Sequence, residues 1–428
     1  MEADHIERKE DGTIIQTCTD DMNEYLMKYP NYVGYATDVG KITGGKKTGE
    51  EALTIFVSKK VDPIELVKSE IIPASLPKEI HKIHDHRMST DVVEIGEVTA
   101  PPTITTEARA TLDDYRYDYN RPFQGGVSVG NIKITAGTAA GTFIANGKKV
   151  LGTNTHVGCE SIRTDLNEQD RRVLQPGPHD GGKETDQFGT LRKAIIMPEG
   201  KPAFNDFCYV EPENEDDLDP EIYEIGVPAG TTTIEVGDLV YKSGRTTGLS
   251  TGTILSTNAT VNVGYNEGTV THKACILTTD MSDGGDSGSL MVSYVDGVPY
   301  VWGYLFAGSD TTTVCHEIQN AMTALGITLY TEEPEDPDHF TLDFELEPIG
   351  EGMYTLRGKV ENKLTELALP SATINLHGIV SMTTDSDGKY EIERLVAAVY
   401  TMTASKEGFT PQTKKVEITP DGQIFEVK

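Results

Sequence analysis

Short apolar runs separated by turns of Gly, Asn and Asp fill the middle of this 428-residue chain. The runs lie at residues 126–129, 142–145, 150–152, 239–241, 252–255, 290–294 and 301–306. They are rich in Val, Ile, Leu, Thr and aromatic residues, most of which favour strands. Many short strands at regular turn spacing predict a sandwich or barrel. One helix is expected after them, at 317–326, where apolar residues recur at helical spacing before a Gly stop.

The sequence on either side of this strand-rich segment, which we assign to 109–330, has a different texture. Residues 1–108 combine a short helical pattern with an apolar strand signal and predict a small α+β accessory domain. Residues 331–342 form an acidic, Pro-rich linker that cannot bury itself. Residues 343–428 alternate apolar and polar side chains without a helix signal, which is typical of a small β-sandwich. We therefore predict a mainly β chain with three folded parts.

Composition limits the partners that this chain can have. Its formal net charge is −31, so nucleic acid and anionic membranes are disfavoured by like-charge repulsion. The first residues are polar, and no apolar run reaches the ~18 residues of a membrane-spanning helix. We therefore expect a cytoplasmic protein, with export without a leader peptide left open.

Cysteine and histidine usage gives no sign of a metal or cofactor. The five cysteines are an odd number, widely spaced and without CxxC pairs, which argues against a disulfide framework or zinc site and fits a reducing compartment. The stretch HKIHDHR at 81–87 offers metal-ligating side chains, but its spacing fits a solvated turn better. We expect no bound metal and no cofactor.

The stretch SDGGDSGSL at 282–290 is consistent with two interpretations. Gly, Asp and Ser all favour tight turns, so the stretch fits a plain turn. It also fits a loop that aims the hydroxyl of Ser287. A serine hydroxyl is a poor nucleophile near neutral pH, so the second interpretation requires a general base and an orienting acid elsewhere in the chain.

His156 and Asp206 are the candidates for that base and acid. His156 follows an apolar strand directly, in the context TNTHV, and Asp206 heads another apolar strand. Taken singly, such a histidine is more often structural and such an aspartate more often a turn or cap residue. Asp206 lies 50 residues after His156, and Ser287 lies 81 residues after Asp206, all inside one strand-rich segment. The three together indicate a catalytic triad.

The motifs around these three residues resemble those of a known family. Residues 120–330 resemble the trypsin-like, chymotrypsin-fold serine proteases, in which two six-stranded β-barrels enclose the active site. GDSG at 285–288 matches the nucleophile loop of that family, and TNTHV at 153–157 matches its histidine motif. GYLFAGS at 303–309 matches the strand that binds the substrate backbone.

Two further resemblances extend this assignment. Residues 30–330 resemble a bacterial group with an N-terminal extension, related to the plant narrow-leaf protein, through 121–130, 134–138, 174–182 and 243–248. Residues 355–419 resemble the carboxypeptidase regulatory-like β-sandwich, through 358–360, 372–374, 384–390 and 406–409. The chain is therefore expected to join an N-terminal α+β domain, a double β-barrel and a transthyretin-like sandwich.

The protease resemblance implies a function and a role for each site residue. His156 would be the general base, Asp206 its orienting acid and Ser287 the nucleophile of an endopeptidase that works through an acyl-enzyme. The backbone N–H groups of Gly285 and Ser287 would form the oxyanion hole. The expected partner is a protein or peptide substrate, with a homo-oligomer or a regulatory protein as further possibilities.

Specificity follows from the implied substrate pocket. Met281 occupies the position that holds an acid in members of the family that cleave after Arg or Lys. A pocket built on Met281, Phe306, Ala307 and Gly308 predicts cleavage after small or apolar residues. No activation sequence of the trypsin type is evident. The alternative to catalysis is a protease-like module that serves only interaction or assembly.

Overall fold

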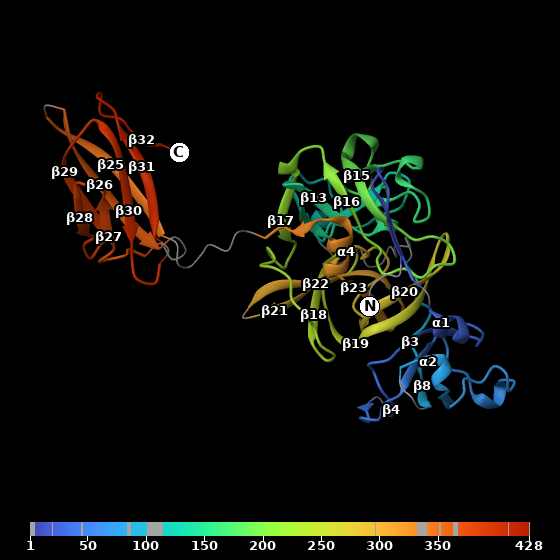
Figure 1. The fold of residues 1–428 in the computed structure, drawn as a ribbon. Helices are drawn as coiled ribbons and strands as arrows, with labels where there is room; N and C mark the ends of the chain where they lie inside the picture. Colours follow the sequence, from blue (N-terminus) through green and yellow to red (C-terminus); the bar gives the residue numbers. More distant parts are fainter. Residues whose placement is uncertain are drawn as a thin grey trace. The chain divides into compact units, whose positions relative to one another are not determined.

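The computed structural model divides the chain into two compact units, Met1–Thr331 and Glu332–Lys428 (Figure 1). It describes residues 5–18, 20–43, 46–83, 87–100, 114–295, 297–331, 340–350, 352–362, 367–409 and 411–427. The predicted mainly β architecture is confirmed. The predicted boundary at residue 108 lies outside the described residues, as do residues 332–339 of the predicted linker at 331–342, whereas residues 340–342 are already part of strand β25, Phe340–Gly350.

The first half of the strand-rich segment is one sheet with the order β11-β10-β14-β15-β16-β13-β12-β24. Its strands are β10 Ser128–Asn131, β11 Gly137–Thr138, β12 Gly141–Ala145, β13 Lys148–Thr153, β14 Arg172–Leu174, β15 Gln187–Ile196, β16 Cys208–Pro212 and β24 Thr328–Leu329. The hairpin of β1 (His5–Arg8) and β2 (Thr13–Thr17) joins it, because β2 pairs in parallel with β15. The strands enclose an apolar core that includes Val129, Leu151 and Phe188.

The second half is a closed six-stranded barrel. Its strands are β18 Leu239–Gly244, β19 Gly248–Tyr265, β20 Gly268–Thr279, β21 Leu290–Val295, β22 Val298–Gly308 and β23 Thr312–Glu317. They run in the order β18-β21-β22-β23-β20-β19, and an additional pairing of β18 with β19 closes the ring. The predicted terminal helix is α4, Ile318–Leu325, which ends at Gly326 in a left-handed conformation. Its buried face packs in the largest hydrophobic core.

The N-terminal residues share a sheet with this second barrel. The strands β3 (Tyr32–Ala36), β6 (Leu53–Val57), β8 (Met88–Glu94) and β7 (Ser75–Leu76) continue the sheet beyond β19. Antiparallel pairing of β3 with β19 makes the join. The helix α1, Asp21–Leu26, begins at Asp20, whose side chain accepts a hydrogen bond from the backbone N–H of Asn23. Residues 1–108 were predicted as an accessory domain; their described part lies in the same compact unit as the barrels.

Short elements complete this unit. The remaining strands are β4 Ile42–Thr43, β5 Lys46–Lys47, β9 Phe123–Gly125 and β17 Leu218–Ile222, and the remaining α-helices are α2 Lys78–His81 and α3 Thr155–Gly158. Single 3-10 turns lie at Pro63–Glu65, Asp114–Arg116, Leu166–Glu168, Pro178–Asp180, Glu184–Asp186 and Glu215–Asp217. Of these, α3 carries His156.

The C-terminal unit is a β-sandwich with its own core. One sheet contains β25 (Phe340–Gly350), β26 (Met353–Asn362) and β29 (Lys389–Val396). The other has the order β28-β27-β30-β31-β32, with β27 Thr373–Leu376, β28 Val380–Thr383, β30 Ala398–Ser405, β31 Gln412–Ile418 and β32 Ile424–Val427. Alternate residues such as Leu356, Ile374 and Met402 fill the space between the sheets.

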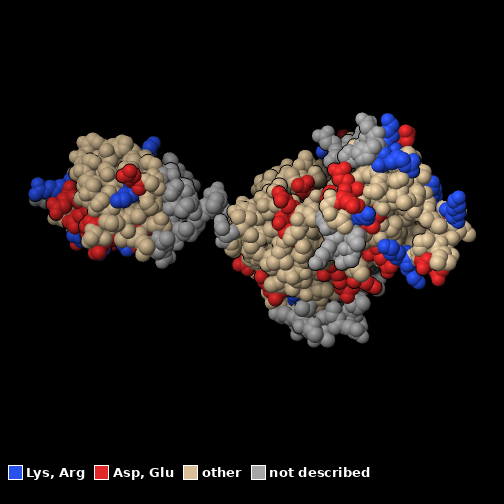
Figure 2. Space-filling view, turned by 90° about the horizontal axis from the view of Figure 1, so that it is seen from below, with Lys and Arg blue, Asp and Glu red and all other residues tan. Residues whose placement is uncertain are grey.

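The surface reflects the acidic composition. On the face shown in Figure 2, Asp and Glu side chains form several groups over the larger unit, whereas its Lys and Arg side chains gather mainly toward one edge. Among the helices that the structure describes, none has the length and apolar character needed to cross a bilayer.

Candidate active site

His156 sits on a turn that is fastened to two neighbouring strands. The strand β13 ends at Thr153, and the one-turn helix α3 follows after Asn154. The Asn154 side-chain amide donates to the carbonyl of Asp206 at 2.7 Å. The hydroxyl of Thr155 lies 3.0 Å from two acceptors, the carbonyls of Ile195 and Phe207. These contacts fix the position of the imidazole, whose side chain is only 8% exposed.

Asp206 lies immediately before β16 and is completely buried. Its Oδ2 accepts a hydrogen bond from Nδ1 of His156 at 2.6 Å, and its Oδ1 accepts one from the backbone N–H of His156 at 3.1 Å. Burial disfavours the carboxylate, but the charge and hydrogen bonds of His156 outweigh burial and lower the pKa of Asp206. The aspartate therefore stays ionised beside the imidazole and fixes its Nδ1–H tautomer.

A buried chain of hydrogen bonds reaches Asp206 from the other barrel. Tyr265, the last residue of β19, donates its hydroxyl to Oδ2 of Asp206 at 2.9 Å. The hydroxyl oxygen of Tyr265 also lies 2.9 Å from Nε2 of His272. Nδ1 of His272 in turn lies 3.0 Å from Nε2 of His316. Burial lowers the pKa of His272 to about 4 and also holds the pKa of His316 well below its usual value, so both rings are neutral near pH 7. The phenol has one proton, and it goes to Asp206, so Tyr265 links the aspartate to the pair of neutral imidazoles.

Ser287 lies on the tight loop between β20 and β21. Gly285 and Gly288 adopt φ angles of 100° and 106°, which L side chains rarely adopt. A Cβ on Gly288 would also lie 2.1 Å from the carbonyl oxygen of Thr138. Thr138, on β11 of the other sheet, donates its backbone N–H to the carbonyl of Ser287 and its hydroxyl to that of Gly285, both at 2.8 Å. Both halves of the fold therefore shape this loop.

Asp286 anchors the loop from inside. Its carboxylate is fully buried and accepts the backbone N–H groups of Thr246 at 2.7 Å and Thr247 at 3.1 Å. The ammonium of Lys242, also fully buried, lies 3.2 Å from its Oδ2. Burial opposes both charges, yet Lys242 and the hydrogen bonds hold the pKa of Asp286 below its usual value. Both partners of this ion pair are side chains, so the pair does not need a chain terminus that cleavage would free.

The structure places Ser287 next to the histidine turn without joining the two side chains. The hydroxyl of Ser287 donates to the carbonyl of Phe306 at 3.4 Å, and Nε2 of His156 is buried without a hydrogen-bond partner among the described residues. The carbonyl oxygen of Ser287 and the side chain of Val157 both lie within 3.0 Å of the position a Cβ would take on Gly137. Catalytic hydrogen bonds are often long before substrate binds.

A cavity of about 1100 Å³ opens beside Ser287. Met281, Ala307 and Gly308, three of the four residues predicted for a substrate pocket, line it, although most of the Met281 side chain packs in the barrel core, and the substrate pocket stays a prediction. Phe306 does not line it: its ring is buried and stacks on His316 at 4.4 Å, so only its backbone faces Ser287. Four carboxylates also line the cavity, those of Glu97, Asp280, Asp283 and Asp310.

Several residues of this site escape analysis of the sequence alone. Tyr265, His272 and Lys242 lie within strands, where nothing in the local sequence distinguishes them from ordinary strand residues. They reach the site through strand register, which local motifs do not encode. Within the described residues, no group of three or more His, Cys, Asp or Glu side chains is placed to hold a metal ion. Of the stretch HKIHDHR, residues 84–86 lie outside the described part of the chain.

The fold is that of a trypsin-like serine protease, a hydrolase. Comparison with family models gives the same class, because residues 114–323 match the trypsin family. Residues 355–425 match the carboxypeptidase regulatory-like domain. The chain thus carries a trypsin domain followed by a carboxypeptidase regulatory-like domain. The narrower resemblance to the narrow-leaf group is not addressed by these matches and stays a prediction.

Solved structures of bacterial proteases are similar to the trypsin domain. Protease A of Thermobifida fusca is 24% identical, with a TM-score of 0.37, over 49% of this chain and 98% of that protein. The chymotrypsin of Cellulomonas bogoriensis is also 24% identical, with a TM-score of 0.34 and the same coverage. A glutamic acid specific serine protease is 21% identical, with a TM-score of 0.36, over 49% of this chain and all of that one. No curated protein sequence matches the chain.

Proposed function

We propose that the protein hydrolyses peptide bonds through His156, Asp206 and Ser287. The observation that carries this proposal is the buried contact of 2.6 Å between Nδ1 of His156 and Asp206, beside a serine held on a constrained loop at a cavity. A buried aspartate paired with an imidazole is what a general base needs, because the carboxylate stabilises the imidazolium that forms. A binding module has no physical need of this arrangement.

The chemical steps follow from these positions. Oγ of Ser287 attacks the carbonyl carbon of the scissile bond, and its proton passes to Nε2 of His156. The developing oxyanion is stabilised by the N–H groups of Gly285 and Ser287, for which the described part of the chain records no other acceptor. His156 then gives the proton to the leaving amine, which leaves an acyl-enzyme. Water, deprotonated by His156, cleaves the ester and restores Ser287.

The preferred substrate residue before the scissile bond is small or apolar in this proposal. Met281, Ala307 and Gly308 support it, because none of them offers a charge to an Arg or Lys side chain. Asp280 and Asp283 line the same cavity, so the preference has to be measured against basic residues directly. A peptide library with every residue at that position should be cleaved after small or apolar residues. A preference for Arg or Lys would contradict this part of the proposal.

Labelling with a fluorophosphonate probe tests the triad. The wild type should be labelled, whereas Ser287→Ala and His156→Ala should not, with melting temperatures close to that of the wild type. Ser293→Ala is the matched control, because its hydroxyl is buried in β21 without a hydrogen-bond partner among the described residues. Failure of the folded wild type to react would favour the alternative, a protease-like module for interaction or assembly.

A further inference from the structure

The segment from Val98 to Ala100 lies as an extra strand against β22. The backbone N–H of Thr99 donates to the carbonyl of Gly308 at 2.9 Å, and the N–H of Gly308 donates to the carbonyl of Thr99 at 3.0 Å. This pairing is antiparallel. On its other side the segment pairs in parallel with Gly264 of β19, through Ala100 N–H and Val98 carbonyl, both at 3.0 Å. The segment therefore bridges two strands of the barrel.

The edge that Thr99 occupies is the one next to the nucleophile. The backbone contacts of β22 with the chain before β21 end at Leu305, which bonds to Ser289 at 2.9 Å and to Gly288 at 3.0 Å, because the chain before Gly288 turns away into the loop that carries Ser287. Beyond that point β22 retains β23 as a partner on one side, where Gly308 pairs with Thr313. Its other side is open to an added strand at Phe306–Gly308. The hydroxyl of Ser287 donates to Phe306 at this same edge.

An open strand edge beside a nucleophile is a site for an extended peptide. Such an edge binds a peptide by adding it as a strand, and the main-chain hydrogen bonds supply affinity without regard to side chains. Antiparallel pairing gives the added chain a direction, from Gly308 toward Phe306 and Ser287. The segment runs in this direction, as a substrate would on its way to the scissile bond.

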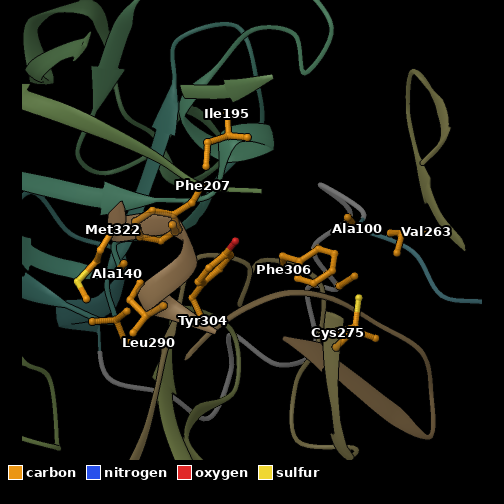
Figure 3. Close-up of a cluster of buried hydrophobic side chains, with 14 of the residues drawn as sticks. Ala100, Ala140, Ile195, Phe207, Val263, Cys275, Leu290, Tyr304, Phe306 and Met322 are labelled. Carbon is orange, nitrogen blue, oxygen red and sulfur yellow. The ribbon is translucent and has the colours of Figure 1, made fainter. Parts of the chain in front are cut away.

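Side chains and cavity agree with occupation of this site. Val98 and Ala100 are buried, at 4% and 2% exposed, and Ala100 lies in the core cluster beside Val263 and Phe306 (Figure 3). Thr99 and Ala100 line the same cavity as Ser287. The segment is thus a bound strand within the substrate cleft, not a loop on the surface.

We propose that the chain's own residues 98–100 occupy the substrate-backbone site at Gly308 and compete with substrate for it. This inference rests on the proposed function, because it names what regulates that same site. Substrates that need only the nucleophile and the adjacent pocket bypass the segment, whereas longer peptides have to displace it. The protease is thereby restrained by a segment that joins its N-terminal sheet to its barrels.

Substitution of Thr99 separates the backbone contact from the side chain. Thr99→Pro removes the N–H that donates to Gly308, whereas Thr99→Ala keeps both backbone hydrogen bonds and serves as the matched control. Thr99→Pro should lower KM for a tetrapeptide anilide of small apolar residues by about tenfold, the worth of one or two backbone hydrogen bonds. Thr99→Ala should leave KM unchanged. The rate of fluorophosphonate labelling should be equal in all three proteins.

Two outcomes distinguish this inference from the proposed function. Equal labelling with an unchanged KM in a folded Thr99→Pro variant would overturn the competition and leave the triad intact. No labelling of any protein would overturn the proposed function. If Thr99→Pro does not fold, the wild type decides: lengthening the substrate from a dipeptide to a tetrapeptide anilide should change kcat/KM by less than about threefold, because the site for the added residues is occupied. A gain well above that value would refute the inference.

Discussion

Asp206 receives a hydrogen bond from Tyr265 as well as from His156, and this second donor makes Tyr265 a positioning residue for the triad. Its phenol holds Oδ2 of the carboxylate at 2.9 Å and shares its charge. We predict that Tyr265→Phe lowers kcat/KM by about tenfold or more, the value of a hydrogen bond to a charged group.

The acid limb of the pH profile separates this role from a merely structural one. Without the phenol, more of the negative charge of Asp206 is left to stabilise the imidazolium of His156, so the limb should move to higher pH. Tyr209→Phe, a change on the neighbouring strand β16, is the control and should leave rate and profile unchanged. An unshifted limb in Tyr265→Phe would limit the phenol to packing.

His272 makes stability depend on pH. Its pKa falls from an ordinary 6.5 to about 4 mainly because of burial, while the charge of Asp206 opposes the shift and that of His156 adds to it. The unfolded chain therefore binds more protons between pH 6.5 and about 4, so the stability contributed by neutral His272 is complete above pH 6.5 and is lost as pH falls. Between pH 7 and 5 the loss is on the order of 2 kcal/mol.

Denaturant unfolding of the wild type and of His272→Asn at both pH values measures this effect. The variant carries no titrating ring at this position, so its unfolding free energy should fall less between pH 7 and 5. His316, which burial also keeps neutral, contributes in the same direction and stays in both proteins. An equal fall in the two proteins would contradict the assignment to His272.

The loop from β20 to β21 depends on one buried ion pair, between Lys242 of β18 and Asp286. Removing one partner of a buried pair leaves an unpaired charge and costs about 3–5 kcal/mol. We predict that Lys242→Met lowers the melting temperature strongly and weakens fluorophosphonate labelling, because Asp286 holds the residues on both sides of it. Lys41→Met is the control: it breaks an exposed pair with Glu50 of 2.9 Å, which is worth little. Similar melting temperatures for the two variants would rule out this role.

Strand and helix signals are where the sequence was most informative. The apolar strand signal expected within residues 1–108 is β6, Leu53–Val57, and the helix expected at 317–326 is α4, since periodicity and a Gly stop are local properties. The strands β3 and β19 lie far apart in the sequence, so the composition of residues 30–36 does not predict that they share a sheet. The positions of the proposed triad lie beside turns with recognisable composition. The partners Tyr265, His272 and Lys242 required the closed barrel to be known.

Among the residues that the structure describes, the hydrophobic cores form two sets, one in each compact unit. Leu342, Leu356, Ile374 and the other members of the sandwich core all belong to the C-terminal unit. The cores of the protease unit draw on both its barrels and its N-terminal strands: Val33, Phe56 and Ile95 lie in the same cluster as Phe207 and Tyr304. The N-terminal residues are thus part of the protease core, whereas the C-terminal sandwich is not.

Truncation from either end should therefore have opposite results. A chain of residues 1–331 keeps every protease core residue and should lose one calorimetric transition while still reacting with a fluorophosphonate. A chain of residues 109–428 loses β3, the partner of β19, and exposes apolar surface on the second barrel, so its protease transition should fall or vanish. Scanning calorimetry and labelling of the two fragments, with the full chain as reference, measure both effects. A stable, fully reactive 109–428 fragment would show that the shared sheet contributes little to the protease fold.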